Sequence, residues 1–141
     1  MTANKFFSII PVLALLCFAP AVHAQSETPK INKKNLVIKE WNADSKMNSK
    51  TLDHVTTYNS EGQKIEEIEY GSSSQKWRKR FEYGPSGKCV KEYEYDAYNR
   101  LLTVKKFEYN EFGRKKIQYT YNGKGKLQTV KTFEYIISDS E

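Results

Sequence analysis

The chain has 141 residues, of which 28% are charged, and its formal net charge is +6. A basic balance of this size favours anionic partners such as acidic glycans, lipid headgroups or acidic proteins. Because the sequence contains only two histidines, a histidine-based metal site or a Ser–His catalytic pair has almost no residues to draw on.

The first 24 residues have the three parts of a signal peptide. Lys5 supplies a positive charge, residues 6–19 are almost continuously apolar, and Val22-His23-Ala24 matches a signal-peptidase site. We therefore expect an exported protein, periplasmic or secreted, whose mature chain begins at Gln25. Export argues against nucleic acid as a partner.

Two other interpretations of this N-terminal stretch are less favoured. A lipoprotein signal at Cys17 needs a small residue before the cysteine, and Leu16 is bulky. A membrane anchor needs a longer apolar run than the one that Pro11 and Pro20 interrupt. If Cys17 leaves with the signal peptide, Cys89 has no partner for an intramolecular disulfide. We expect Cys89 to be a packing residue.

The rest of the chain divides into three segments. Residues 25–33 are polar and predict a flexible N-terminal segment, residues 34–137 predict a single β-repeat domain, and residues 138–141 form an acidic tail. Within the domain, KNLVIKEW (34–41) and TLDHVTTY (51–58) are the first two predicted strands, and a polar loop joins them.

From residue 58 onward the sequence repeats. Tyrosines end successive runs at intervals of 12 to 14 residues, and every second tyrosine is 25 or 26 residues apart, so the unit is a hairpin. Aromatic and β-branched residues alternate with polar ones, which predicts strands. We predict an all-β protein, an antiparallel meander of about eight strands that is either a twisted open sheet or a partly rolled barrel. A homodimer through a sheet edge is one expected assembly.

The segments between the runs predict one type of turn. Five are four-residue loops, namely NSEG, GPSG, DAYN, NEFG and NGKG, and all but DAYN end in glycine. Asn or Asp first and Gly last is typical of a type I turn closed by a G1 bulge, whose last residue has positive φ. Asn99 takes that place in DAYN. One bulge per turn makes Tyr109 pair with Lys115.

Counting one bulge per turn gathers aromatic residues and lysines on one face of the sheet. Lys79 then lies opposite Tyr93, and Lys105 lies opposite both Lys91 and Tyr119, within reach of cation–π contacts. The other face is mainly charged, and because both faces carry mid-strand charges we expect no membrane span in the mature form. The candidate binding face consists of Trp77, Lys79, Phe81, Tyr83, Lys91, Tyr93, Tyr95, Lys105, Phe107, Tyr109, Tyr119, Tyr121, Lys131, Phe133 and Tyr135.

An aromatic and lysine-rich face favours a non-catalytic binding module. Rings would stack on sugar faces while ammonium groups pair with carboxylates or sulfates, so the expected partner is a polysaccharide or a cell-surface protein. The alternative is a structural or assembly protein whose aromatic face is its core or an oligomer interface. Lysine stems that cover the rings of a single-layer sheet would give the same pattern.

The sequence offers little for catalysis. His54, the only histidine after the signal peptide, fits a surface position in a strand. Glutamates such as Glu82 and Glu108 recur at one place in the repeat, which solubility explains better than a catalytic carboxylate pair. No Gly-rich phosphate loop opens a helix. We expect a protein that is not an enzyme, with no catalytic residues, cofactor or metal.

The segment YEYDAYNRLLTV resembles a YD (RHS-type) repeat, whose pattern is Tyr-x-Tyr-Asp-x-x-Gly-Arg-Leu. The mature chain as a whole is also similar to small secreted hairpin-repeat proteins of unknown function from gut-associated bacteria. YD-repeat proteins use their strands as shells and surface-binding scaffolds, so the resemblance implies a non-catalytic role. The matching residues are Tyr93, Tyr95, Asp96, Arg100 and Leu101, with Asn99 in the place of the glycine.

Overall fold

The structure is a computed structural model that describes residues 30–43 and 49–137. The expected signal peptide (1–24), most of the expected N-terminal segment (25–33) and the expected acidic tail (138–141) lie outside the described residues. The eight strands all belong to the compact unit Ile31–Glu141.

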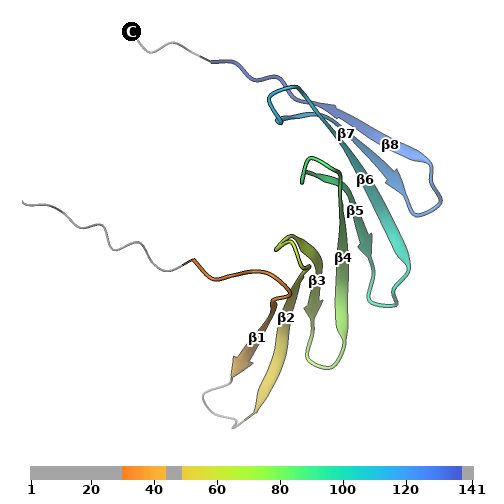
Figure 1. Cartoon of the computed structure of the whole chain (residues 1–141). Helices are drawn as coiled ribbons and strands as arrows, with labels where there is room; N and C mark the ends of the chain where they lie inside the picture. The colour runs from red at the N-terminus through yellow and green to blue at the C-terminus, as the bar shows by residue number, and fades with distance from the viewer. Residues whose placement is uncertain (1–29, 44–48, 138–141) are drawn as a thin grey trace, which may run out of the picture. The chain divides into compact units, whose positions relative to one another are not determined.

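All eight strands form one antiparallel sheet, in which each strand lies beside its neighbours in the chain (Figure 1). The sheet is open, and β1 and β8 are its edges. This confirms the predicted all-β meander. No helix that is long and apolar enough to cross a membrane occurs among the described residues. The strands are β1 Val37–Ala43, β2 Lys50–Tyr58, β3 Lys64–Tyr70, β4 Gln75–Tyr83, β5 Cys89–Tyr95, β6 Leu101–Tyr109, β7 Lys115–Asn122 and β8 Leu127–Thr132.

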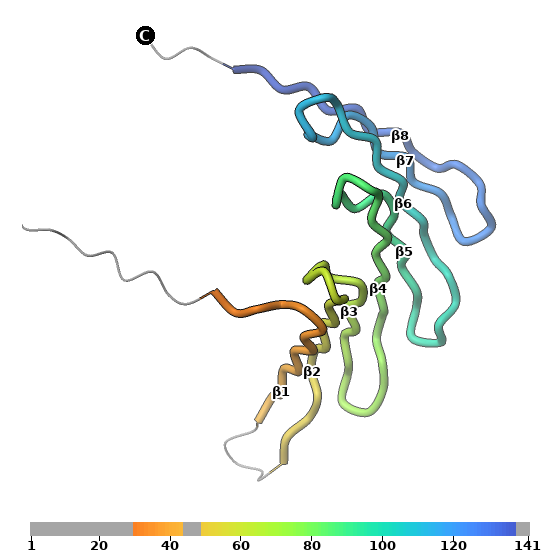
Figure 2. The backbone as a smooth tube through the Cα atoms, in the orientation of Figure 1, coloured from red at the N-terminus to blue at the C-terminus, as the bar shows by residue number. Residues whose placement is uncertain are grey.

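The hairpin turns have the predicted geometry. Positive φ angles occur at the last residue of each four-residue turn, for example +69° at Gly113 and +59° at Asn99. In the turn after β6, the Gly113 N–H donates to the Asn110 carbonyl and the Asn110 N–H donates to the Arg114 carbonyl. The type I turn with a G1 bulge is therefore confirmed. We call the turns at 59–62, 84–87 and 110–113 the upper turns; they lie in a row, and the other turns lie at the opposite ends of the strands (Figure 2).

The first residue of the turn explains why this geometry recurs. The side-chain oxygen of Asn110 accepts hydrogen bonds from the N–H groups of Phe112 and Arg114. Such a side chain satisfies turn donors that the strand ladder leaves unpaired. The same pair of bonds forms at the first residue of three other turns, Asn59, Asp96 and Asn122.

A second bulge, which was not predicted from the sequence, follows every hairpin turn. Tyr109 pairs with Lys115 as expected, but the next pair is Glu108 with Ile117, so Lys116 is an extra residue. The extra residue shifts the rest of the strand by one position, and a shift of one exchanges the faces of the sheet. The extra residues in the six hairpins are Ile65, Lys76, Val90, Leu102, Lys116 and Gln128.

The sheet is a single layer with little buried surface. Only Phe107 and Thr56 are buried among the described residues, at 8% and 7% exposure. Most residues of the inner strands are half-buried by their cross-strand neighbours, whereas β1 and β8 are exposed along their whole length. Contacts between neighbouring strands therefore have to supply the stability that a second layer supplies in other sheets.

Candidate functional site

The second bulge divides the expected binding face between the two sides of the sheet. Opposite residues of an antiparallel pair share a face, and Lys105 lies opposite Thr120 whereas Tyr119 lies opposite Lys106. The prediction of one continuous aromatic face was therefore wrong. Face A carries Trp77, Lys79, Phe81, Tyr83, Lys105, Phe107, Tyr109, Lys131, Phe133 and Tyr135, and face B carries Lys91, Tyr93, Tyr95, Tyr119 and Tyr121.

The expected lysine–tyrosine pairs are replaced by other contacts. Lys105 Nζ lies 2.8 Å from Glu92 Oε1 on face A. Lys91 Nζ lies 3.1 Å from Glu82 Oε2 on face B, and opposite Lys106 rather than Lys105. Lys79 faces Glu94, and its ammonium lies 5.0 Å from the centre of the Trp77 ring, not beside Tyr93. These ammonium groups already have partners within the sheet.

Three tyrosine hydroxyls of face A also have internal partners. Tyr83, Tyr109 and Tyr135 donate to the backbone carbonyls of Lys64, Cys89 and Lys115, at 2.8, 2.6 and 2.8 Å. Each bond joins the end of the first strand of one hairpin to the start of the second strand of the hairpin before it. Burial raises the pKa values of Tyr83 and Tyr109, in keeping with neutral hydroxyl donors. These hydroxyls stabilise the sheet.

Face B holds one tightly linked polar group. The Tyr93 hydroxyl donates to Glu82 Oε1 at 2.8 Å, beside the Glu82–Lys91 ion pair. The hydrogen bond from Tyr93, and then that from Lys91, lowers the pKa of Glu82. A carboxylate held in its ionised form is a poor general acid near neutral pH.

His54 and Cys89 have structural surroundings. His54 Nδ1 lies 3.1 Å from Glu69 Oε2, and its ring packs edge-on against Trp77 at 6.0 Å. Cys89 is half-buried and pairs with Tyr83. Burial raises the pKa of the Cys89 thiol, so little thiolate is present at neutral pH. No group of three or more metal-ligating side chains is found in residues 30–43 and 49–137.

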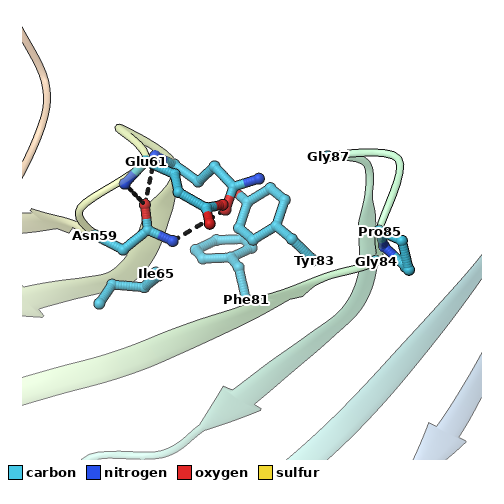
Figure 3. Close-up of a pocket in the computed structure, with 9 residues that line it drawn as sticks. Asn59, Glu61, Ile65, Phe81, Tyr83, Gly84, Pro85 and Gly87 are labelled. Carbon is cyan, nitrogen blue, oxygen red and sulfur yellow. Dashed lines mark hydrogen bonds between the residues drawn. The ribbon is translucent and has the colours of Figure 1, made fainter.

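A surface cleft lies between the first two upper turns (Figure 3). Its volume is about 530 Å³. The rings of Phe81 and Tyr83 form one part of its lining, and Asn59, whose Nδ2 donates to Gln63 Oε1 at 2.9 Å, lies beside them. The lining is completed by Glu61, Ile65, Gly84, Pro85 and Gly87. We call this the first cleft.

A second cleft lies two hairpins further along, with a volume of about 560 Å³. The Arg114 guanidinium lies 5.3 Å from the centre of the Tyr135 ring, on one part of its lining. The remaining lining residues are Asn110, Phe112, Phe133 and Ile137. Asn110, Arg114, Phe133 and Tyr135 stand at the repeat positions of Asn59, Gln63, Phe81 and Tyr83, so the two clefts are copies of one feature.

Between the two clefts, at the place where the second and third upper turns lie side by side, the side chain of Lys88 reaches the turn glycine Gly113. The Lys88 Cε atom lies 3.2 Å from the position that a Cβ atom would take on Gly113. Lys88 follows its turn glycine directly, as Gln63 and Arg114 follow theirs. The residue after the turn glycine therefore determines which group lies beside each upper turn: the Gln63 amide in the first cleft, the Lys88 ammonium group between the clefts and the Arg114 guanidinium in the second cleft.

Four of the cleft residues, Phe81, Tyr83, Phe133 and Tyr135, were predicted from the sequence, whereas the polar ones were not. The signal for Gln63 and Arg114 was their position, one residue after the turn glycine in every upper turn. Comparison with known proteins adds no further residue: no protein-family model matches the chain, and no curated protein matches it either. The resemblance to YD repeats stays a prediction.

Proposed function

We propose that this protein is an exported, non-catalytic binding module that holds a linear polysaccharide along its upper turns. The observation that carries the proposal is the repetition of one cleft, with two aromatic rings and a turn asparagine, at two places along the sheet. Concave sites with apolar walls and a few convergent polar groups are the usual form of small-ligand sites. Sugar rings have this mixed character, with apolar C–H faces and hydroxyl edges.

The spacing of the clefts favours a polymer over a single sugar. They lie two hairpins apart, which is four strand spacings or about 19 Å. A chain that enters both clefts gains avidity, because the second contact becomes intramolecular. Two cations also favour an anionic polymer, because Lys88 lies between the clefts and Arg114 lines the second. In the first cleft, the Glu61 carboxylate can accept hydrogen bonds from sugar hydroxyl groups.

The composition of the clefts favours binding over catalysis. Glycoside hydrolysis uses a pair of carboxyl groups on either side of the scissile bond. Among the residues that line the first cleft, Glu61 is the only carboxylate, and the residues that line the second include none.

A glycan array that includes anionic polysaccharides tests the proposal. Phe112→Ala removes an exposed ring of the second cleft, and Tyr98→Ala is the matched control, since both are third residues of their turns and are 77% and 80% exposed. We expect Phe112→Ala and Gln63→Ala to weaken binding several-fold and Tyr98→Ala to leave it unchanged. The absence of binding to any glycan, or equal losses in all three variants, would contradict the proposal.

A second candidate function, structural assembly, is favoured by a different observation. Both edge strands of the open sheet are exposed along their whole length. Exposed edges pair readily with other strands, so we also propose that copies of the chain associate through them. Light scattering over a range of protein concentrations tests this, and a monomer at every concentration would contradict it.

A further inference from the structure

The two edge strands have complementary places in the hairpin repeat. Four strand pairs connect one hairpin to the next: β1–β2, β3–β4, β5–β6 and β7–β8. In each of them, one residue of the first strand lies opposite the residue that stands three positions before the tyrosine at the end of the next strand's run. These residues are Lys39 in β1, Glu66 in β3, Lys91 in β5 and Ile117 in β7. Strand β1 therefore has the place of a second strand in a hairpin, and residues 30–36 before it contain no first strand.

Strand β8 is the converse, a first strand that no second strand follows within the described residues, which end at Ile137. It leads into Phe133-Glu134-Tyr135, the phrase that ends β4 and β6 as Phe-Glu-Tyr. The Tyr135 hydroxyl donates to the Lys115 carbonyl just as the Tyr83 and Tyr109 hydroxyls donate to theirs. The Phe133 N–H donates to the Lys116 carbonyl at 3.0 Å, so this phrase stays in line with β8.

The sequences of the two half-hairpins match those of a complete one. Lys39-Glu40-Trp41 in β1 corresponds to Lys91-Glu92-Tyr93 in β5. The phrase KTFEY at 131–135 corresponds to KRFEY at 79–83 in β4. Since β4 and β5 pair with each other, β8 and β1 carry the side chains that would pair in the same way.

We infer that β8 of one copy pairs with β1 of a second copy and completes the repeat across the contact. The register follows from the complete hairpins. In each of them the residue before the terminal tyrosine lies opposite a fixed position of the second strand: Glu82 lies opposite Lys91 in β4–β5, and Glu108 lies opposite Ile117 in β6–β7. Glu134 of one copy then lies opposite Lys39 of the next. This ion pair repeats the Glu82–Lys91 pair, in which Nζ and Oε2 are 3.1 Å apart.

The direction of the strands gives an open-ended assembly. Eight strands alternate in direction, so β1 and β8 run opposite ways and their contact is antiparallel, like every other contact in the sheet. The two surfaces in the contact are different, and a head-to-tail contact that does not close produces a chain of copies. Such a chain would also extend the row of upper turns from copy to copy.

The described residues leave both edges accessible. The segment before β1 lies over the β2–β3 turn: Lys33 Cβ is 3.6 Å from the position of a Cβ atom on Gly62, and the Lys33 ammonium lies 5.3 Å from the centre of the Tyr58 ring. Asn35 N–H donates to the Asn59 carbonyl, which holds this segment in place. The described residues before β1 therefore lie on the β2 side of β1, and they do not cover its free edge.

This inference rests on the second candidate function, assembly, and is independent of glycan binding. It excludes the symmetric contacts β1–β1 and β8–β8, which simple edge pairing would permit. The test therefore has to separate a head-to-tail contact from a symmetric one as well as from a monomer.

Disulfide trapping makes this separation. Lys39→Cys and Glu134→Cys are prepared separately on a Cys89→Ser background, then mixed and oxidised mildly; opposite residues of antiparallel strands have Cα atoms about 4.5–5.5 Å apart, which suits a disulfide. We expect covalent dimers in the mixture, far more than in either variant alone, and a ladder of products when one chain carries both cysteines. Dimers from Glu134→Cys alone at the same rate would overturn the head-to-tail contact and leave assembly standing. A wholly unlinked monomer would overturn both.

Charge exchange supplies a second measurement without cysteines. Lys39→Glu and Glu134→Lys should each weaken association roughly tenfold, since an attraction becomes a repulsion. A chain carrying both substitutions should associate like the original, because every contact again has opposite charges. Glu111→Lys, in an exposed upper turn, makes the same charge change as Glu134→Lys and should have no effect. Unchanged association in both single variants would overturn the inferred register.

Discussion

The hydroxyl of Tyr109 donates a hydrogen bond to the carbonyl oxygen of Cys89, 2.6 Å away, and ties the end of β6 to the start of β5. The ladder between these two strands ends at Lys91 and Lys106, before either strand reaches its upper turn. The tyrosine thus joins the two hairpins beyond their last paired residues. The equivalent bonds of Tyr83 and Tyr135 indicate that this is how successive hairpins are held together at the upper turns.

Tyr109→Phe should destabilise the protein by about 1 kcal/mol, the typical net value of one hydrogen bond. The substitution leaves the ring in place and removes only the donor to the Cys89 carbonyl. Urea unfolding measures the difference. Tyr98→Phe is the control, because Tyr98 is 80% exposed in its turn, and it should unfold like the original protein. Equal stability of all three proteins would show that the hydroxyl contact contributes nothing.

Two glycines of the β7–β8 turn should respond differently to alanine. A Cβ atom on Gly123 would overlap the Leu101 carbonyl oxygen, so Gly123→Ala has to displace backbone and should cost about 3 kcal/mol. Gly125 has φ of +79° and nothing within 4 Å of its Cβ position, so Gly125→Ala meets only backbone strain of about 1 kcal/mol.

Thermal unfolding of the two variants compares these costs, and Gly125→Asn is a useful third protein. Asparagine tolerates positive φ, as Asn99 does at the equivalent place in its own turn. Gly125→Asn should therefore be more stable than Gly125→Ala. If Gly123→Ala unfolded at the temperature of the original protein, the close approach to Leu101 would be wrong.

The turns could be predicted because their chemistry is local. Four residues contain the Asn or Asp that caps the turn and the residue that takes positive φ, and no distant contact is needed to recognise them. The number of strands and their order followed directly, because each turn connects neighbours in an antiparallel sheet. Gly113 and Asn99 both have the conformation that their position in the turn requires.

The faces of the sheet could not be read from the turns alone, because the second bulge depends on contacts across strands. With one bulge, Lys91 faces Lys105, which is unfavourable. With the second, Lys91 lies opposite Glu82 in β4 and Lys105 lies opposite Glu92 in β5, although Lys91 still lies opposite a lysine in β6, Lys106. Opposite charges in cross-strand pairs favour a register, so the available signal was the two Glu–Lys pairs that only the second bulge allows, Glu82 with Lys91 and Glu92 with Lys105.

The clefts were predicted only in their aromatic half. Phe81 and Tyr83 are conspicuous in the repeat, but the first cleft exists because two turns lie side by side, which places Glu61 and Gln63 near those rings. The spacing of residues within one hairpin does not show which residues of the neighbouring turn lie beside these rings. It requires the stacking of consecutive hairpins, which the sequence implied only through the period of the repeat.

The observed register predicts the outcome of a charge exchange between Lys105 and Glu92. Their ion pair is 2.8 Å long and the two side chains are 29% and 18% exposed. Lys105→Glu or Glu92→Lys alone should destabilise by about 1 kcal/mol, because like charges then lie opposite each other. The double exchange should recover most of the loss in urea unfolding. If Lys105 faced Tyr119 instead, the two losses would simply add.

Glu82 should contribute a part of the stability that acid removes. The hydrogen bond from Tyr93 and the ion pair with Lys91 lower its pKa in the folded chain below the value in the unfolded chain. Its contribution is therefore present above the unfolded pKa of about 4.3 and is lost as pH falls through the folded pKa. Glu82→Gln should lose less stability than the original protein between about pH 7 and about pH 3 in urea unfolding. Tyr93→Phe should act in the same direction, since it removes the largest cause of the shift, while Glu111→Gln in an exposed turn serves as the control. An identical acid profile for Glu82→Gln and the original protein would show that the Tyr93–Glu82–Lys91 group does not couple folding to pH.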